Sequence, residues 1–387
     1  MTFTQIPQQF APLGGELRYT LVTEQAATLD LRIADAGNGT LIGTKRFAGA
    51  TTASFDAAPY LRRAVRFTPT TGTTGLRAAD GRTVLGYIEA ETAQVPAPSA
   101  AIGNPTERTV ASATAYGKTG VVTPGNEVPG SNAPADGTNP VKKAAEKPEV
   151  GSSTRDLLPE NTPVTSPLRT FLPCRSTVTA PALLTAMPAE RLISPGECDE
   201  LTLFPAEACT VTVTAQAGAT TTAESYRTTK GGLYLFRLDM RDFPEAEALI
   251  VDAGECGTVV YTVVPAAPGA RRLAWRSSAG SIEHYTFPIE KSATVETAKK
   301  RAYGTDGHLT VTAGTEHRIT LVSAYEPRTT IEALAEILSS PDVWLAGETG
   351  YTAVDVMTEQ AVVHRYGAVT CMEIGIRPKR KTGMSWN

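Results

Sequence analysis

Glu283, His284 and Tyr285 are the neighbouring residues of this sequence whose types come closest to an acid–base site. They lie in the stretch "RRLAWRSSAGSIEHYTFPIE", which spans residues 271–290. A histidine that acts as a general base needs a carboxylate within hydrogen-bond reach to orient its ring. Neighbouring side chains on a β-strand point to opposite faces, so Glu283 and Tyr285 share one face and His284 lies on the other. The spacing therefore argues against a catalytic dyad of Glu283 and His284.

The same stretch has the features of a β-hairpin. Gly280 lies in the short loop "SSAGS", which separates two segments of alternating residues and is typical of a hairpin connection. Leu273, Tyr285 and Phe287 supply apolar surface around Trp275. We therefore predict a structural hairpin in which Trp275 is buried in a core.

A second pair of acidic residues, Glu332 and Glu336, stands one helical turn apart. Two carboxylates at that spacing could serve as the acid and the base of a glycosidase. The surrounding segment "PRTTIEALAEILSSP" is amphipathic, and both residues fall on its polar face. The pattern therefore favours a solvent-exposed helix face over a catalytic pair.

The remaining histidines offer no metal-binding pattern, because none lies in an HxH or HExxH spacing. The chain also lacks the GxSxG motif of serine hydrolases and the GxxxxGK loop that binds nucleotide phosphates. We therefore predict no catalytic, cofactor-binding or metal-binding residues, and we expect that the protein is not an enzyme. The three histidines are His308, His317 and His364.

The five cysteines are odd in number and form no CxxC motif. Such spacing argues against a zinc site and against the disulfide framework of a small secreted protein. Four of them lie between residues 174 and 256, which leaves one bridge in that region open. We expect reduced, half-buried thiols, because disulfides are rare in reducing compartments. The cysteines are Cys174, Cys198, Cys209, Cys256 and Cys371.

Length and charge limit the classes of protein to which this chain can belong. The chain has 387 residues, more than one hydrophobic core usually serves, so several domains are expected. The formal net charge is −4 with both signs interspersed, which argues against a nucleic-acid partner. The basic run "RPKRK" near the C-terminus is predicted to be solvated, with contact to an acidic partner as the alternative.

No segment has the features of a membrane anchor or a leader. No apolar run approaches the roughly 18 residues of a membrane span, so membrane insertion is not expected. The opening "MTFTQIPQQFAPLGG" lacks a basic region followed by an apolar one. This composition predicts synthesis in the cytoplasm without a signal peptide.

Short alternating apolar stretches separated by Gly and Pro recur along the chain, which is typical of β-sandwiches and barrels. The predicted fold class is therefore mainly β, with several β-sandwich-like modules. In the first module, Asn38–Gly39 predicts a hairpin turn and Tyr60–Leu61 a short helical turn. The predicted modules are an N-terminal β domain (1–91), a central β-sandwich (166–290) and a C-terminal β domain (291–387).

Residues 92–165 differ from the rest, with ten prolines and with Tyr116 as the one aromatic residue. Such a segment cannot bury enough apolar surface to offset the entropy lost when it is ordered. Its prolines preset φ and lower the entropy lost when the chain is laid on a partner. We predict an extended linker, rich in Pro, Gly, Ala and Thr, that contacts neighbouring subunits.

One helix is predicted, near residues 329–340, in the C-terminal domain. Its apolar residues recur at i, i+3, i+4 and i+7, and Pro341 follows its end. Thr329 and Glu332 have capping-box spacing at its start. The apolar face consists of Ile331, Leu334, Ala335 and Leu338.

Several motifs carry a family resemblance. They are "LAWRSSAGSIEHYTFP", "SAYEPRTTIEALAEILSSPDVW" and "VDVMTEQAVVHRYGAVTCMEIGIRPKRK", together with "FTQIP" and "SFDAAPYLR" in the first module. This set resembles uncharacterised proteins encoded among the tail genes of Bacteroidetes phages and prophages. The resemblance touches both ends of the chain and omits the Pro-rich segment.

The resemblance implies a structural virion protein of the tail or baseplate, assembled in multiple copies. Its partners would then be copies of itself and other phage structural proteins, and its location the virion. The alternative is a receptor-binding or glycan-binding module at the tail tip. Exposed aromatic side chains of such a module would stack on a host surface glycan.

Overall fold

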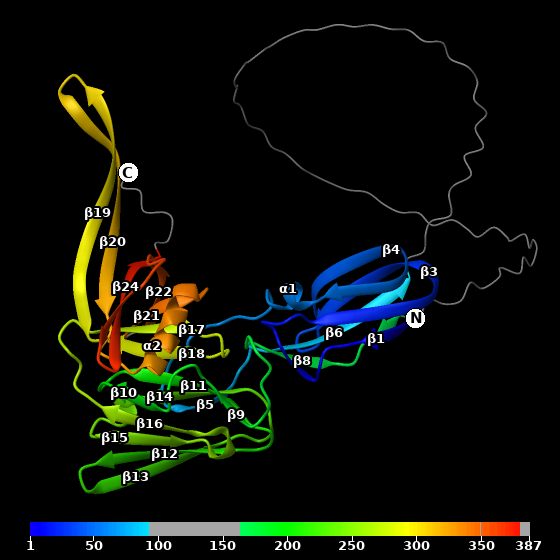
Figure 1. Ribbon diagram of the computed structural model, residues 1–387, viewed down its shortest axis with the longest axis horizontal. Coiled ribbons are helices and arrows are strands. Elements are labelled where there is room, and N and C mark those ends of the chain that lie inside the picture. Colours follow the sequence, from blue (N-terminus) through cyan, green and yellow to red (C-terminus); the bar gives the residue numbers. More distant parts are fainter. Residues whose placement is uncertain (93–162, 349, 380–387) are drawn as a thin grey trace, which may run out of the picture. The chain divides into compact units, whose positions relative to one another are not determined.

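The computed structural model describes residues 1–92, 163–348 and 350–379. Most of the predicted linker, residues 92–165, therefore lies outside the described residues. Strands dominate the described part and form four sheets with sandwich-like packing, which confirms the prediction of a mainly-β protein (Figure 1). None of the helices in these ranges has the length and apolar character needed to cross a bilayer.

The first sheet has seven strands, in the order β1-β3-β6-β8-β2 with β4 on β3 and β7 on β6. Strands β3 and β4 form a hairpin whose turn contains Gly39 at φ 68°, as the Asn38–Gly39 pair predicts. Helix α1 (Ala58–Leu61) confirms the predicted helical turn. The strands are β1 (Thr2–Gln5), β2 (Phe10–Pro12), β3 (Arg18–Asp35), β4 (Thr40–Asp56), β6 (Val84–Thr92), β7 (Val164–Thr165) and β8 (Arg169–Leu172).

The Pro-rich segment begins and ends in this one sheet. β6 precedes the segment, β7 follows it, and the two pair antiparallel, with Glu89 opposite Thr165. β8 then pairs with β6 as well. Both ends of the segment therefore lie in the same sheet, whereas the expected modules place it between an N-terminal domain (1–91) and a central domain (166–290). Pairing between strands on either side of a long insertion has no local sequence signal.

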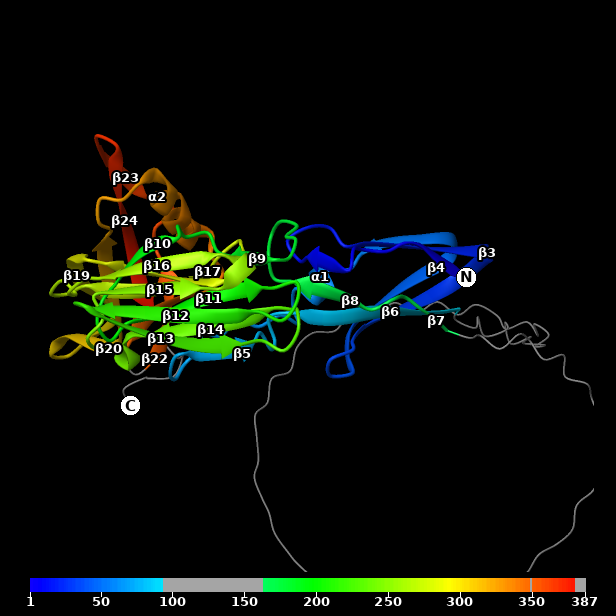
Figure 2. The same cartoon turned by 90° about the horizontal axis from the view of Figure 1, so that it is seen from below.

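Two further sheets pack face to face as a sandwich (Figure 2). Their order is β10-β16-β15-β12-β13 in one and β5-β14-β11-β9 in the other. Leu201 of β11 and Val213 of β12 lie in the shared core. The strands are β5 (Gly75–Ala78), β9 (Ala182–Leu184), β10 (Glu190–Ile193), β11 (Cys198–Phe204), β12 (Thr210–Ala217), β13 (Thr220–Arg227), β14 (Tyr234–Asp239), β15 (Ala248–Asp252) and β16 (Thr258–Val263).

The fourth sheet has the order β18-β17-β21-β22-β24-β20-β19, with β23 on β24. It unites the stretch 271–290 with the C-terminal residues, because β17 pairs with β21. The strands are β17 (Arg271–Arg276), β18 (Ile282–Phe287), β19 (Ile289–Gly304), β20 (Gly307–Val322), β21 (Val343–Gly347), β22 (Gly350–Val356), β23 (Val362–Tyr366) and β24 (Val369–Pro378).

The sheets do not follow the expected division of the chain. β5 comes from the first 91 residues but pairs with β14 of the sandwich. β8 comes after residue 166 but belongs to the first sheet. The expected boundary at residue 290 falls inside the fourth sheet. Strand exchange of this kind depends on pairing between distant residues, which alternation within one strand does not report.

Helix α2 (Arg328–Ala335) continues into the 3₁₀ turn η3 (Glu336–Ser339) and packs on the fourth sheet. Ile331 and Leu334 are buried as predicted, but Ala335 is exposed and Ala333 is buried in its place. The predicted capping box is absent. The helix begins one residue earlier than expected, with Pro327 as its N-cap, so no side chain caps it.

Replacing Leu334 by alanine is expected to lower the free energy of unfolding by about 2–5 kcal/mol, since it empties a fully buried site. Urea denaturation of the full chain measures the change. Glu332→Ala is the matched control, because Glu332 lies on the exposed face of the same helix. Equal midpoints for the two variants would mean that α2 does not contribute to the core.

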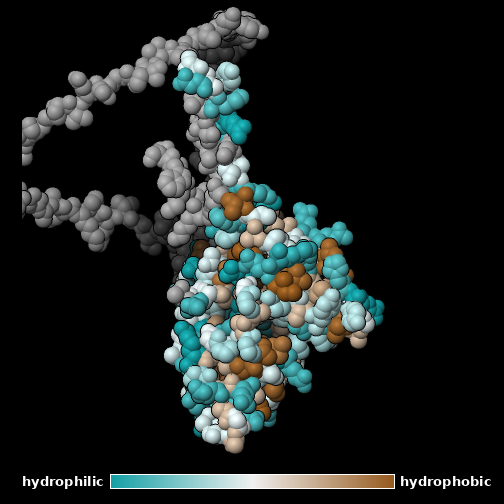
Figure 3. All heavy atoms as spheres, turned by 90° about the vertical axis from the view of Figure 1, so that its left-hand side faces the viewer, coloured by the Kyte–Doolittle hydropathy of each residue, from teal (hydrophilic) through white to brown (hydrophobic). Residues whose placement is uncertain are grey.

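β19 and β20 form a long two-stranded arm (Figure 1). Among the described residues, the part of β20 that also pairs with β24 is Ile319–Val322, and no other described strand pairs with the rest of the hairpin. Side chains of residues 291–297 are exposed. In Figure 3 the arm rises from the body, and its described residues are mainly polar.

Candidate functional site

β17 and β18 form the predicted hairpin, and Trp275 is completely buried. Leu273 and Phe287 lie in the same core. Gly280 adopts φ 89° in the turn, and a Cβ at this position would lie 2.9 Å from Cys174 N. Only glycine fits such a conformation without strain. The prediction of a structural hairpin is confirmed.

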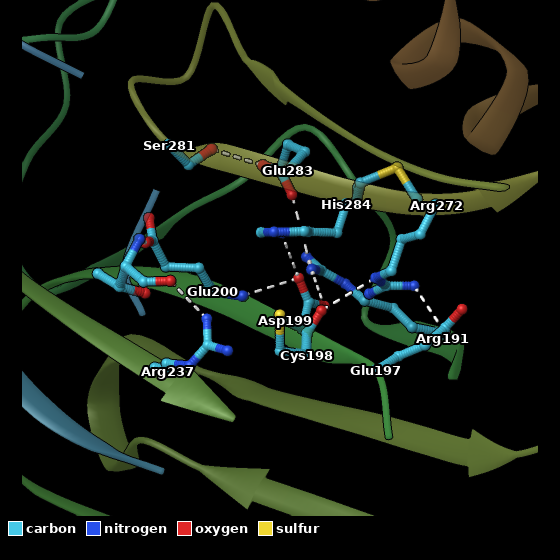
Figure 4. Close-up of polar contacts among 12 residues, drawn as sticks. Arg191, Glu197, Cys198, Asp199, Glu200, Arg237, Arg272, Ser281, Glu283 and His284 are labelled. Atoms are coloured by element: carbon cyan, nitrogen blue, oxygen red, sulfur yellow. Dashed lines mark hydrogen bonds and ion pairs between the residues drawn. The ribbon is translucent and has the colours of Figure 1, made fainter. Parts of the chain in front are cut away.

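Glu283 and His284 point to opposite faces of β18, as predicted, with Glu283 opposite Trp275 and His284 opposite Ala274 of β17. His284 nevertheless meets a carboxylate, because Asp199 reaches it from β11 of the sandwich (Figure 4). His284 Nδ1 lies 3.1 Å from Asp199 Oδ1, and among the described residues this nitrogen has no aligned hydrogen-bond partner. The strand pattern correctly removed Glu283 as the partner but did not identify Asp199.

Asp199 is the centre of a buried polar network. Its carboxylate accepts hydrogen bonds from Arg191 Nη1 at 3.0 Å, from Tyr261 Oη at 2.9 Å and from Glu200 N at 2.8 Å. Burial alone would raise the pKa of Asp199, but Arg191 and His284 outweigh burial and hold it well below its usual range. The network consists of Arg191, Asp199, Tyr261, Arg272, Glu283, His284 and Tyr351.

The Arg191 guanidinium has a partner at each nitrogen. Nε donates to Pro188 O at 3.0 Å, and Nη2 donates to Thr185 Oγ1 at 2.7 Å. Nη1 donates to Asp199 Oδ2 and lies 3.6 Å from Glu283 Oε2. Burial alone would lower the pKa of Arg191, yet the two carboxylates raise it overall. Arg191 is therefore a fixed cation with two buried acids as neighbours.

Glu283 is the more weakly compensated of these two acids. Its Oε1 accepts from Ala186 N at 3.0 Å and from Ser281 Oγ at 2.6 Å. Burial raises the pKa of Glu283, and the opposing effect of Arg191 is smaller. One guanidinium thus lies between a carboxyl with a lowered pKa and a carboxyl with a raised one.

Replacing Glu283 by glutamine is expected to change the pH dependence of stability. Because the pKa of Glu283 is raised in the folded state, wild-type stability falls as pH rises from the unfolded pKa of about 4.3 through the folded pKa. The glutamine variant lacks this loss, and its amide oxygen still accepts from Ala186 N and Ser281 Oγ. The free energy of unfolding of the variant minus that of the wild type should therefore increase with pH.

Urea denaturation at several pH values above about 4 measures that difference. Glu332→Gln is the control, since Glu332 is exposed. A difference that shrinks with rising pH would mean that the ionised Glu283, paired with Arg191, stabilises the fold.

Arg272 joins the loop before β11 to the hairpin. Its Nε donates to Cys198 O at 2.9 Å, and Nη1 donates to Glu197 Oε2 at 3.0 Å and to Thr286 Oγ1 at 2.8 Å. Thr286 Oγ1 in turn donates to Glu197 Oε1 at 2.8 Å. These contacts hold the sandwich against the edge of the fourth sheet.

Tyr351 of β22 continues the network beyond His284. Its hydroxyl lies 3.0 Å from His284 Nε2, 3.2 Å from Cys198 Sγ and 3.5 Å from Arg237 Nη1. The pKa of Tyr351 is raised, first by burial and then by Cys198. The hydroxyl is therefore a neutral hydrogen-bonding group at ordinary pH.

Two buried arginines tie the segment around β5 to the sandwich. Arg82 Nη1 lies 2.6 Å from Glu200 Oε1, and both side chains are almost fully buried. Arg237 donates from Nε to Gly72 O at 2.8 Å and from Nη1 to Thr70 O at 2.5 Å. The strand exchange at β5 is thus secured by charged groups as well as by backbone pairing.

The contacts run from the Asp199 carboxylate to the His284 imidazole and on to the Tyr351 hydroxyl, which is the order of groups in a catalytic triad. The hydroxyl is a poor nucleophile here, because the pKa of Tyr351 is raised. A cavity of about 170 Å³ is lined by Asp199 and His284 among others, but Tyr351 does not line it. The contact between His284 Nε2 and Tyr351 Oη, at 3.0 Å, matches the base–hydroxyl contact of a triad, so the arrangement differs from one in the raised pKa of Tyr351 and in its position outside the cavity. The arrangement joins β11 of the sandwich to β18 and β22 of the fourth sheet.

The two helix carboxylates do not face one another. Glu332 forms an exposed ion pair with Arg328 at 2.7 Å. Glu336 is half-buried, contrary to the expected solvent position, because it accepts hydrogen bonds from the backbone and the hydroxyl of Ser278. The hairpin loop that contains Ser278 covers this end of the helix, which the helical pattern alone does not show.

The remaining candidate residues lie apart. The exposed His308 meets the Tyr303 ring at 5.0 Å on the arm. Arg377, the first residue of "RPKRK", pairs with Glu316 and Asp355, and the last residues of that run lie outside the described part. In residues 1–92, 163–348 and 350–379, no group of three His, Cys, Asp or Glu is placed to hold a metal ion. His317 and His364 are exposed, and the five cysteines are free thiols.

Sequence reasoning missed most of the network, although a weak signal was present. Asp199 and Glu200 begin the buried strand "CDELTLF", where acidic residues are unusual. Arg191 in "ERLI" and Arg272 in "RRLAW" are likewise charged residues that are buried in short strands. Charged residues at inward strand positions imply buried partners, but they do not identify them.

Comparisons with known proteins add little to this geometry. No family model and no curated protein matches the chain. A solved structure described as "Crystal structure of Dpr2 Ig1-Ig2 in complex with DIP-Theta Ig1-Ig3" has a TM-score of 0.17 and 8% identity to this chain. The alignment covers 98% of this chain and 90% of that one. Similarity this low carries no argument about fold or function.

Proposed function

We propose that this chain is a structural subunit of a bacteriophage virion, in the tail or baseplate, and that it assembles in multiple copies. The family resemblance of the sequence motifs supports the phage assignment. The single structural observation that supports a role in assembly is the β19–β20 arm. In this proposal the protein is not an enzyme, and its partners are copies of itself and other virion proteins.

The arm lacks the support that a hairpin normally needs. Its strands pair from Ile289 opposite Val322 to Gly304 opposite Gly307, and β24 contacts only the base. A two-stranded hairpin is marginally stable in water unless a further strand or a core covers it. A ribbon this long is therefore best explained by a partner surface that covers it in an assembly.

The exposed side chains of the arm are suited to such contacts. Val295 is 60% exposed and Tyr303 is 81% exposed, although both are residue types that favour burial. Aromatic residues are enriched in protein interfaces, and Tyr303 stands next to the turn of the hairpin. A closed symmetric assembly presents the same neighbouring surface to every copy of the arm.

The buried polar network supports a structural role. Its buried charged groups are paired between strands of two sheets, with Arg191 beside both Asp199 and Glu283. The Pro-rich segment stays in the proposal on sequence grounds, as an element that contacts neighbouring subunits. β6 and β7 bring both of its ends to one sheet.

The proposal is tested by shortening the arm in the phage that encodes this chain. Residues 296–316 are replaced by the dipeptide Asn-Gly, which favours a two-residue hairpin turn. Val295 and His317 then flank the new turn, and they are already paired with each other in the β19–β20 ladder. The purified variant is expected to keep the melting temperature of the wild type. It should be absent from phage particles examined by negative-stain imaging with an antibody against this chain.

Tyr366→Ser is the matched control, since it removes an exposed aromatic side chain outside the arm. The control should enter particles normally. Absence of the wild-type chain from purified particles would refute the virion assignment. Normal incorporation of the shortened chain would refute the role of the arm.

A receptor-binding or glycan-binding module at the tail tip is the second candidate. One observation favours it: Tyr325 and Tyr366 are 58% and 76% exposed, and their ring centroids lie 6.2 Å apart. Aromatic rings exposed in this way can stack on sugars. Loss of adsorption to host cells by particles with Tyr366→Ser, at normal particle yield, would favour this function.

A further inference from the structure

Two cysteines far apart in the sequence meet at one end of the sandwich. Cys209 directly precedes β12, and Cys256 ends the 3₁₀ turn η2 (Gly254–Cys256) between β15 and β16. Cys209 Sγ lies 3.2 Å from Ala253 O, and Cys256 N donates to that same oxygen at 3.2 Å. Cys209 Sγ and Cys256 N thus contact one and the same backbone oxygen, Ala253 O.

The backbone holds both cysteines in place. Cys209 N donates to Thr228 Oγ1 at 2.7 Å, and Thr228 N donates to Cys209 O at 2.8 Å. On the other side, Asp252 Oδ1 accepts from Gly254 N at 3.0 Å and from Thr258 Oγ1 at 3.2 Å, which fixes the turn before Cys256. Hydrogen bonds thus hold the backbone beside both cysteines, so formation of a bridge between them depends on rotation of the two side chains.

The pair is accessible from solvent on one side. Both cysteines line a cavity of about 540 Å³ with Pro205 and Glu255. Cys209 is half-buried, whereas Cys256 is 7% exposed. A small disulfide therefore meets the more exposed Cys209 first.

We infer that Cys209 and Cys256 are a redox pair, a dithiol that thiol–disulfide exchange with a low-molecular-weight disulfide converts to an intramolecular disulfide. This inference does not rest on the proposed function. The other cysteines are not part of the pair.

The exchange proceeds in two steps with glutathione disulfide as the oxidant. The Cys209 thiolate attacks one glutathione sulfur, the glutathione S–S bond breaks, and one glutathione thiolate leaves. The Cys256 thiolate then attacks the Cys209 sulfur, and the second glutathione thiolate leaves. Two protein thiols are oxidised, one glutathione disulfide is reduced, and the two thiol protons pass to the glutathione thiolates.

The surroundings predict slow exchange and a bridge that persists. Burial raises the pKa of Cys209, and it raises the pKa of Cys256 to about 11. Both groups are then mostly protonated at neutral pH, so the dithiol reacts slowly. A thiol of high pKa is also a poor leaving group, so the bridge resists reduction once it has formed.

The test uses the purified full chain, equilibrated with glutathione disulfide and then denatured for thiol titration. The reduced chain has five titratable thiols, and equilibration is expected to lower that number by two. Peptide mapping should then show Cys209 joined to Cys256. The melting temperature should rise by roughly 5 °C or more, because the bridge closes a long loop.

After equilibration with glutathione disulfide, the Cys209→Ser variant should not lose a pair of thiols. The Cys198→Ser variant is the matched control and should still lose two. Should Cys209→Ser fail to fold, the peptide map of the wild-type chain decides the matter alone. An unchanged count, a bridge between other cysteines, or glutathione retained on Cys209 without a bridge would each overturn the inference.

Discussion

Replacing Asp199 by alanine is expected to lower the free energy of unfolding by about 3–5 kcal/mol, the usual cost of breaking a buried ion pair from one side. Asp199 is 1% exposed. Its removal leaves Arg191 with Glu283, at 3.6 Å, as its remaining carboxylate. The Tyr261 hydroxyl and the Glu200 amide also lose their acceptor.

Urea denaturation at neutral pH measures this loss, and two variants separate its causes. Asp199→Asn keeps an oxygen that can accept from Tyr261 and Glu200, so it should cost less than Asp199→Ala. Asp30→Ala is the surface control, because Asp30 pairs with the exposed Arg46 and should leave the midpoint nearly unchanged. If Asp199→Ala behaves like Asp30→Ala, the network does not join the sheets.

The two acids beside Arg191 act on stability in opposite directions. The pKa of Asp199 is lowered in the folded state, so its contribution is present above its unfolded pKa and is lost as pH falls through the folded pKa. The pKa of Glu283 is raised, so ionising it costs stability as pH rises. The cation lies nearer to Asp199, at 3.0 Å against 3.6 Å, and His284 and Arg272 also lower the pKa of Asp199.

The features that the sequence predicted correctly are local ones. The β17–β18 hairpin follows from alternation on both sides of a loop with Gly280, and its partners lie within twenty residues. Helix α2 likewise follows from the spacing of Ile331 and Leu334 along one turn. In both cases the residues that determine the element are close in the chain, so their periodicity is sufficient.

The features that the sequence did not predict depend on distant residues. Tyr261 lies 62 residues from Asp199 in the chain, and Tyr351 lies 67 residues from His284. Alternation shows which face of a strand His284 occupies, but it does not show which strand lies across from that face. The same limit applies to β5 and β8, whose partners belong to sheets formed by other parts of the chain.

Replacing Trp275 by alanine is expected to lower the free energy of unfolding by about 3–5 kcal/mol, because it leaves a large cavity in the core beneath α2. Trp275 is completely buried among Leu273, Phe287 and the helix residues Ile331 and Leu334. It also belongs to β17, which pairs with both β18 and β21. Few sites in the fourth sheet combine this volume with contacts to so many elements.

Trp275→Phe is the informative comparison. The Nε1 of Trp275 is buried without a hydrogen-bond partner. Phenylalanine removes that unpaired donor, whose burial costs about 1–3 kcal/mol, while it keeps most of the aromatic volume. The variant should therefore lose far less stability than Trp275→Ala in urea denaturation. If the two variants lose the same amount, Nε1 has a partner, such as a bound water, and the polar network extends into this core.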